Sequence, residues 1–271
     1  MSRILALSTI TFREGIRNRS VFGILLFSLF LLGLNIAVAG FFMRDIGKVS
    51  ADMNLSALSF AGLLLVLFVG INLISKDIDK KTIHLVLSKP ISRTEYIFGK
   101  FLGIQCFIAV SLAFLIVLSS GTMFLLQYLY PNYFGQFSWP VYFVACFFIL
   151  VKLSVLSSIV VFFSSITTSS FITLMFSICV YIMGISIDEV VFYLRSHLSV
   201  EALPTSEQLR HLIDFVSYVI PNFSVFDFKI EAAHGLVIGW DRLGISLCYG
   251  VSYQVLALVF ASLIFQRREF N

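Results

Sequence analysis

The sequence has 271 residues, of which 59% are hydrophobic and 13% are charged. Soluble domains contain about 45–50% apolar and about 25% charged residues, so this composition excludes an ordinary soluble domain and indicates an integral membrane protein. The net charge of +4 does not identify a partner by itself, and no nucleic-acid partner is expected.

Residues 1–19 are expected to form a helix that lies in the membrane interface. The charged residues Arg13, Glu14 and Arg17 fall on the side of a helical projection opposite an apolar stripe that includes Phe12. Such a two-sided helix can rest its apolar side on the acyl chains and its charged side on the headgroups.

Apolar runs of membrane-spanning length predict an all-α fold with six transmembrane helices, since a bilayer requires about 20 residues per helix. The third run is longer than required, so its helix should tilt or project beyond the membrane. Gly99 and Gly103 near its start have the G-x-x-x-G spacing that lets two helices approach closely. The spans are expected at residues 20–43, 57–75, 96–127, 140–163, 171–187 and 243–265, followed by a tail at 266–271.

Residues 76–95 form a charged segment between the second and third spans. Helical spacing from Asp77 to Ser88 predicts a short amphipathic helix. Pro90 should end that helix, and Ser92 with Glu95 three residues later predicts a capping box that starts the next helix. The charged segment is therefore expected to be a helix and a sharp turn that lead into the third span.

Residues 188–242 are expected to be a structured segment with an acidic surface. Thr205 and Gln208 predict a capping box at the start of an amphipathic helix that stops before Pro221. A second amphipathic helix is predicted from apolar residues in helical register. These two helices should lie at the outer membrane interface or cap the cavity between spans. The register residues of the second helix are Phe223, Phe226, Ile230, Ala233 and Val237.

The distribution of Lys and Arg predicts the orientation. Six spans place both termini on one side, and twelve of the 19 Lys and Arg residues lie on that side, against six on the other. Positive charge concentrates in short cytoplasmic segments, so both termini and the charged segment should be cytoplasmic.

Three polar residues inside predicted spans are candidates for a substrate pathway: Lys152, Asn35 and Asn72. Lys152 could be a cation that faces a cavity and meets an anionic substrate or headgroup. It could also extend to the cytoplasmic interface or bond backbone carbonyls, and this second interpretation is favoured because Lys side chains are long. The two asparagines more often bridge helices than bind substrate.

Motifs for catalysis and for ATP or metal binding are missing from the sequence. The two Gly-Lys pairs, at Gly47 and Gly99, lack the other residues of a phosphate-binding P-loop. No H-E-x-x-H or G-x-S-x-G pattern occurs, and the four histidines have no metal-ligand spacing. No catalytic or metal-binding residue and no cofactor bound by this chain is therefore expected.

Together these features resemble the permease subunits of ABC-2 type transporters, also called type V exporters. Within that family the chain is most similar to the multi-copper enzyme maturation permeases, the NosY-like proteins. The missing metal-ligand spacing gives no support to the copper association in that name. The residues that carry the resemblance are Phe12, Arg13, Glu14, Arg17, Asn18, Arg19, Ser88, Lys89, Pro90, Ile91, Ser92, Arg93, Tyr96, Gly99, Lys100, Pro221, Asn222, Gln266, Arg267, Arg268 and Glu269.

The resemblance implies a half-transporter in the bacterial cytoplasmic (inner) membrane. Two permease subunits would pair, a second copy of this chain being favoured, and a cytoplasmic ABC ATPase dimer would supply ATP and Mg²⁺ sites. The charged segment would be the coupling helix that contacts the ATPase. Its implied coupling residues are Asp77, Ile78, Lys81, Thr82, Leu85, Val86, Pro90 and Arg93.

Three alternatives stay open. The charged segment could be a basic loop that only fixes topology and contacts anionic lipid. The complex could also be a mechanical transmitter that moves residues 188–242 against an extracytoplasmic partner protein without passing a substrate. An intramembrane enzyme is disfavoured, because no pair of catalytic groups is predicted at membrane depth.

Overall fold

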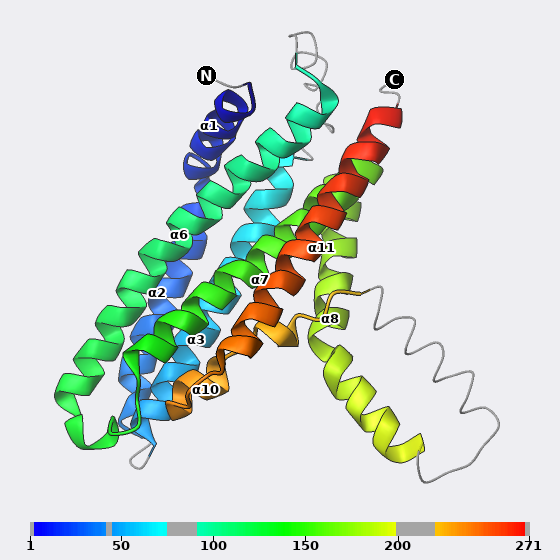
Figure 1. The fold of residues 1–271 in the computed structure, drawn as a ribbon. Coiled ribbons are helices and arrows are strands. Elements are labelled where there is room, and N and C mark those ends of the chain that lie inside the picture. The colour runs from blue at the N-terminus through cyan, green and yellow to red at the C-terminus, as the bar shows by residue number, and fades with distance from the viewer. Residues whose placement is uncertain (1–2, 42–44, 75–90, 199–219, 269–271) are drawn as a thin grey trace.

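The computed structural model describes residues 3–41, 45–74, 91–198 and 220–268, and Figure 1 shows them as one group of helices. No β-strand occurs in these ranges. The main helices are α1 (Arg3–Ile16), α2 (Arg19–Ala39), α3 (Ile46–Leu64), α6 (Arg93–Leu129), α7 (Trp139–Ile166), α8 (Ser170–Leu198), α10 (Lys229–His234) and α11 (Trp240–Arg267), and the π-helix η1 (Leu65–Gly70) continues α3.

Within the described ranges, six helices are long and apolar enough to span a membrane, in agreement with the predicted number. The second of them differs from the prediction, because it begins at Ile46 rather than at residue 57. The charged residues of this stretch do not interrupt the helix, since they lie toward its surface: Asp52 is exposed, and Lys48 pairs with Asp45 at 3.4 Å. The fifth also extends beyond its predicted end at residue 187, as α8 continues to Leu198.

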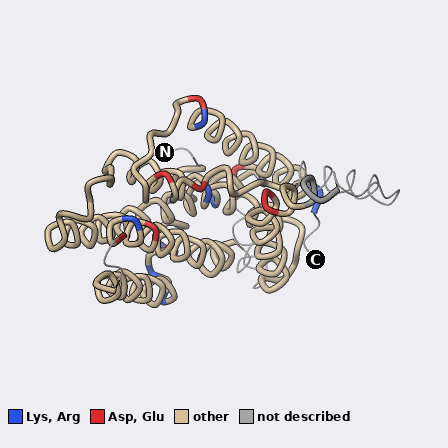
Figure 2. Tube along the Cα trace, turned by 90° about the horizontal axis from the view of Figure 1, so that it is seen from below, with Lys and Arg blue, Asp and Glu red and all other residues tan. Residues whose placement is uncertain are grey.

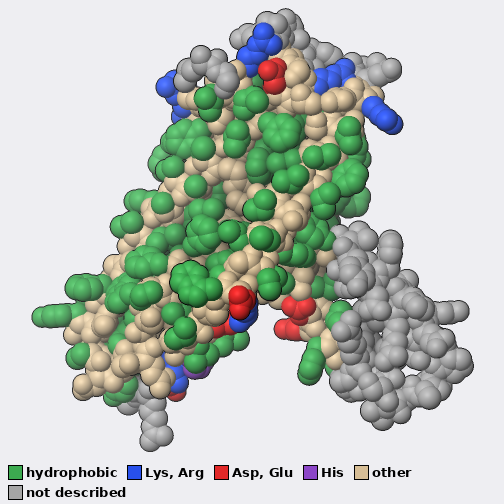
Figure 3. Space-filling model, viewed as in Figure 1, with side chains coloured by type: hydrophobic (Ala, Val, Ile, Leu, Met, Phe, Trp, Pro, Cys, Tyr) green, Lys and Arg blue, Asp and Glu red, His purple; other side chains and the backbone are tan. Residues whose placement is uncertain are grey.

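The centre of the helix group is formed by α3 and α7. In their most apolar windows 72% and 78% of the residues are buried, against 22% in α2, α8 and α11. The outer helices instead expose large apolar side chains, such as Phe22 and Leu26 on α2 and Phe171 on α8. Figure 3 shows hydrophobic side chains over much of the face it presents, which suits contact with lipid.

Both chain ends lie at the same end of the helix group (Figure 1). Lys and Arg side chains gather at this end in the space-filling view of Figure 3, and the view from below in Figure 2 shows that most of the trace is uncharged. An even number of crossings agrees with six spans. That this end faces the cytoplasm stays a prediction from the charge distribution.

The N-terminal helix α1 packs closely against the start of α6 through glycines. A Cβ atom added at Gly103 would lie 2.6 Å from Thr11 Cβ and 2.8 Å from the Ser8 carbonyl oxygen. One added at Gly99 would lie 2.9 Å from Leu7 Cβ. The predicted close approach at the G-x-x-x-G spacing is therefore present, and α1 is the partner helix.

The second outer helix is not a single amphipathic helix, which corrects the prediction. Phe223 and Phe226 are buried, but Ile230 and Val237 are 69% and 95% exposed. The chain here forms a short 3₁₀ turn (Ser224–Phe226) and then α10, which ends at Gly235 with φ of +63°. A left-handed glycine closes a helix end, so the helical register cannot continue to Val237. The first outer helix lies outside the described residues.

Two glycines of α6 provide a matched test of the α1 contact. The G103A variant should lower the unfolding temperature of the purified protein, because the new methyl group overlaps α1, and overpacking costs about 1–3 kcal/mol. The G121A variant should be neutral or stabilising, since no atom lies within 4 Å of a Cβ at that position. Equal unfolding temperatures for both variants would contradict the packing role.

Candidate functional site

The candidate site is the place where α1, the start of α6 and the ends of α7 and α11 meet, at the end of the molecule that carries both termini. We call it the terminal junction, and its central residues are Arg93, Tyr96, Lys100 and Arg268. The chain enters it from the charged segment at Ser92, which begins α6.

The predicted capping box at the start of α6 is confirmed. The Ser92 backbone N–H donates to Glu95 Oε2 at 2.8 Å, and the Glu95 N–H donates to Ser92 Oγ at 3.2 Å. The Glu95 carboxylate also lies 4.0 Å from Arg3 of α1. The first turn of α6 is thus fixed both by its own cap and by an ion pair to the N-terminal helix.

Arg93 stabilises the C-terminal end of α11. Its Nη1 group lies 3.2 Å from the Phe265 carbonyl oxygen, 2.8 Å from that of Gln266 and 2.6 Å from that of Arg268. The last carbonyls of a helix have no partner within the helix and carry partial negative charge. A guanidinium at this position therefore both satisfies and neutralises the end of α11.

Arg268 does the same for α7. Its Nη1 donates to the carbonyl oxygens of Ser164 and Ser165, at 3.3 and 2.9 Å, and its Nη2 donates to that of Thr167 at 2.9 Å. Arg93 on α6 thus holds α11, and the residue just after α11 holds α7. The three helix ends are connected by two arginines in series.

Lys100 connects α1 and the end of the second spanning helix to α6. It is only 6% exposed, and its Nζ donates to the Leu73 carbonyl oxygen at 2.7 Å and lies 4.0 Å from Glu14 Oε2. Tyr96, whose ring centroid is 5.9 Å from the same Nζ, stacks on Phe265 at 5.5 Å. Sequence reasoning used Lys100 as a cytoplasmic charge and as one of the residues that carry the family resemblance, but assigned it no contact. Its i, i+4 spacing from Tyr96 is the signal that could have placed both on one helix face.

Most of the predicted coupling residues lie outside the described part of the chain. These are Asp77, Ile78, Lys81, Thr82, Leu85, Val86 and Pro90. Arg93 alone of that set is described, and it is bonded to carbonyls near the end of α11.

The three charged residues on the predicted polar side of α1 differ in their exposure. Arg13 and Arg17 are exposed, but Glu14 is half-buried and faces Lys100. The buried face of α1 is set by the residues that meet α6, because small side chains allow the closest approach. Those buried residues are Leu7, Ser8, Thr11 and Gly15.

Asn35 bridges helices in the interior. Its Nδ2 donates to the Ser50 carbonyl oxygen at 3.0 Å and to Asn54 Oδ1 at 2.9 Å. Asn54 in turn donates to Thr122 Oγ1 at 3.0 Å. This polar connection runs from α2 through α3 to α6, where buried amides need such partners.

Lys152 is buried in the middle of α7 and is only 5% exposed. Its Nζ lies 5.5 Å from the Tyr181 ring centroid on α8, a cation–π contact. In the segment between α8 and α11, Asp227 attracts this charge electrostatically and Lys229 repels it. Asn72 is exposed and donates to the Phe68 carbonyl oxygen. The three pathway candidates therefore have separate sets of neighbours.

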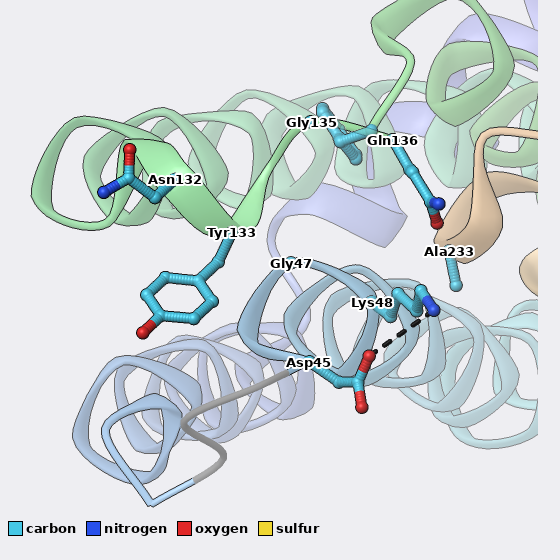
Figure 4. Close-up of a pocket in the computed structure, with 9 residues that line it drawn as sticks. Asp45, Gly47, Lys48, Asn132, Tyr133, Gly135, Gln136 and Ala233 are labelled. Atoms are coloured by element: carbon cyan, nitrogen blue, oxygen red, sulfur yellow. Dashed lines mark ion pairs between the residues drawn. The ribbon is translucent and has the colours of Figure 1, made fainter.

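A polar pocket of about 320 Å³ lies at the opposite end of the molecule. Figure 4 shows Gln136 extending toward α10, where Ala233 lies, with the Lys48–Asp45 ion pair below. The pocket joins the start of α3, the loop after α6 and α10. None of its lining residues is one of the central residues of the terminal junction.

One protein-family model matches the chain over nearly its whole length. The model described as ABC-2 family transporter protein matches residues 5–270, from α1 through the end of α11. No curated protein sequence matches the chain.

The neighbouring residues Arg267 and Arg268 test the series of arginine caps. The R268Q variant should lose about 1–3 kcal/mol of stability, because three carbonyl oxygens at the end of α7 lose their charged donor. The R267Q variant removes the same charge from an exposed side chain and should unfold like the wild type. Thermal unfolding in detergent measures both, and equal losses would contradict a capping role for Arg268.

Proposed function

Because the chain belongs to the ABC-2 family of transporter proteins, whose model matches residues 5–270, we propose that it is the permease subunit of an ABC exporter. It moves a substrate across the membrane with energy from ATP that a separate ATPase subunit hydrolyses. Its resemblance to the NosY-like permeases, carried by the charged segment and the two ends of the chain, supports a further proposal that it belongs to that group.

The observation that carries this proposal is the terminal junction. Near the end of the charged segment, Ser92 caps α6, and Arg93 is the first residue of that helix. Arg93 is bonded to the end of α11, and Lys100 to the end of the second span. A displacement of the charged segment is therefore passed directly to three spanning helices, as coupling to an ATPase requires.

The packing of the subunit favours a substrate path between two permease subunits. The central helices α3 and α7 contain many buried apolar side chains such as Leu55, Leu156 and Val160. A polar passage through this core would remove those contacts. The exposed faces of α2, α8 and α11 instead offer surfaces to a second subunit, and a second copy of this chain satisfies that need without another gene product.

The proposed location is the cytoplasmic membrane of a bacterial cell, as the family resemblance implies. The charge distribution supports an orientation in which the terminal junction faces the cytoplasm. Lys and Arg gather at this end, as the positive-inside rule requires. The ATPase that would dock here needs cytoplasmic ATP and Mg²⁺. The charge distribution and the need for ATP therefore both favour a terminal junction on the cytoplasmic side.

A second candidate function, mechanical transmission to an extracytoplasmic partner, is favoured by the attachment of the segment before α11. The Asn222 N–H donates to the Tyr249 hydroxyl at 2.8 Å, and Asn222 Nδ2 donates to Asp188 Oδ1 at 2.6 Å. Ser224 Oγ donates to the Ile185 carbonyl oxygen at 3.0 Å. Because these bonds reach both α8 and α11, this segment moves with the spanning helices.

The coupling role is tested by the double variant L85D/V86D. Two carboxylates on the predicted apolar face of the coupling helix should abolish co-purification with the ATPase and transport. The control I230D/V237D makes the same chemical change at two exposed positions near α10 and should retain both. If L85D/V86D keeps ATPase association and transport, the coupling role is wrong.

Crosslinking separates transport from mechanical transmission. A photoreactive amino acid at Val237, which is 95% exposed, should capture one specific extracytoplasmic protein in cells if the subunit is a transmitter. A transporter without such a partner should give no specific product. The same amino acid at Phe223, which is 0% exposed, is the control and should capture nothing in either case.

A further inference from the structure

A cleft lies beside the junction between α1 and α2, on the end of the molecule that carries the termini. It has a volume of about 680 Å³. Its polar lining comes from Arg13, Arg17 and Asn18 at the end of α1 and from Asn72 near the end of the second span, and its apolar lining includes Ile10. None of these side chains takes part in the helix caps of the terminal junction.

The cleft has an excess of positive charge. Arg13 and Arg17 are exposed, and neither forms an ion pair with any residue in the described part of the chain. Glu14 is the carboxylate of the lining, and it lies 4.0 Å from Lys100 Nζ. Since Lys100 offsets Glu14, the two arginines make the cleft a site for an anion.

The two asparagines add complementary polar groups. Asn18 caps α2 by accepting from the Ser20 N–H at 3.1 Å through Oδ1, which leaves its Nδ2 group as a donor. Asn72 donates its Nδ2 to the Phe68 carbonyl oxygen, which leaves Oδ1 as an acceptor. The start of α2 also brings the positive end of a helix of 21 residues to the cleft. The Asn18 Nδ2 donor thus suits a phosphate group of a ligand, and the Asn72 Oδ1 acceptor suits a hydroxyl group.

The surroundings of the cleft place its ligand at the level of lipid headgroups. The spanning helix α2 begins at Arg19, directly after the cleft, and exposes Phe22 at 68% and Leu26 at 71%. Ile10, on the lining, is 65% exposed. A phosphate held between the arginines would therefore have an apolar surface beside it that leads along α2 into the bilayer.

We propose that this cleft binds the headgroup of an anionic glycerophospholipid, with the acyl chains along α2. Arg13 and Arg17 bind the phosphate, Asn18 Nδ2 donates to it, and Asn72 Oδ1 accepts from a headgroup hydroxyl. The site lies on the chain itself and does not depend on the substrate or on the mechanism of the transporter. Its occupation holds the α1–α2 corner at a fixed depth in the leaflet.

Native mass spectrometry of the purified full-length chain in neutral detergent measures this binding, with phosphatidylglycerol as the probe and phosphatidylcholine as the zwitterionic comparison. A basic residue near anionic lipid contributes about 1 kcal/mol, so R13Q and R17Q should each weaken phosphatidylglycerol binding about fivefold and the double variant about 25-fold. The double variant R13K/R17K keeps both charges and should retain most of the binding. Phosphatidylcholine should bind weakly to every variant.

Arg19 provides the matched control, because it is exposed, lies two residues from Arg17 and is not part of the lining. The R19Q variant should bind phosphatidylglycerol like the wild type. An equal loss for R19Q and R17Q overturns the proposal, since it shows general attraction to positive charge. Unfolding temperatures measured without added lipid should be the same for R17Q and R19Q, so the comparison does not depend on folding.

Two further results would also overturn the lipid assignment. Displacement of phosphatidylglycerol by millimolar inorganic phosphate would show a site for small anions rather than for a lipid. Unchanged lipid binding by R13Q/R17Q together with lost ATPase co-purification would show a contact surface for a partner protein. Selective loss of phosphatidylglycerol binding, resistant to free phosphate, supports the proposal.

Discussion

The carbonyl groups at the ends of helices impose the constraint on which the terminal junction depends. A spanning helix leaves its last carbonyls without partners, and here two arginines supply them. Arg93 reaches the end of α11, and Arg268 reaches the end of α7. Because Arg93 lies in α6 and Arg268 directly follows α11, and each bonds to the end of another helix, satisfying the helix ends also ties α6, α11 and α7 together.

Two further contacts extend this connection to the N-terminal half. Gly99 and Gly103 let α1 approach α6 closely, and Lys100, on the same turn of α6, bonds to the end of the second span. The glycine contacts attach α1 to the start of α6, and the buried lysine attaches the second span to it. The start of α6 becomes the point through which the predicted coupling helix can act on most of the spanning helices.

The two faces of α1 then have different roles. Its buried face is rigidly packed on α6, while Arg13 and Arg17 remain exposed on the side of the α1–α2 corner. A helix that contacts the moving part of a transporter on one side and lipid on the other can respond to both. In the family to which the chain belongs, ATP hydrolysis takes place in another subunit, so under the proposed function these contacts would be the means by which this subunit receives work.

Sequence alone determined the features that depend on near neighbours in the chain. Apolar run length gave six spans, Ser92 and Glu95 gave the start of α6, and Gly99 and Gly103 gave a close helix contact. Local patterns failed where context decides: the polar start of α3 continued as helix, and the predicted outer helix ended at Gly235.

Only the tertiary structure decided which helix ends Arg93 and Arg268 would cap. Arg93 lies more than 170 residues before the carbonyls it contacts, and Arg268 more than 100 after those of α7. Every residue has a carbonyl, so the acceptors carry no signature in the sequence. The partner of each arginine is fixed only by which helices pack side by side.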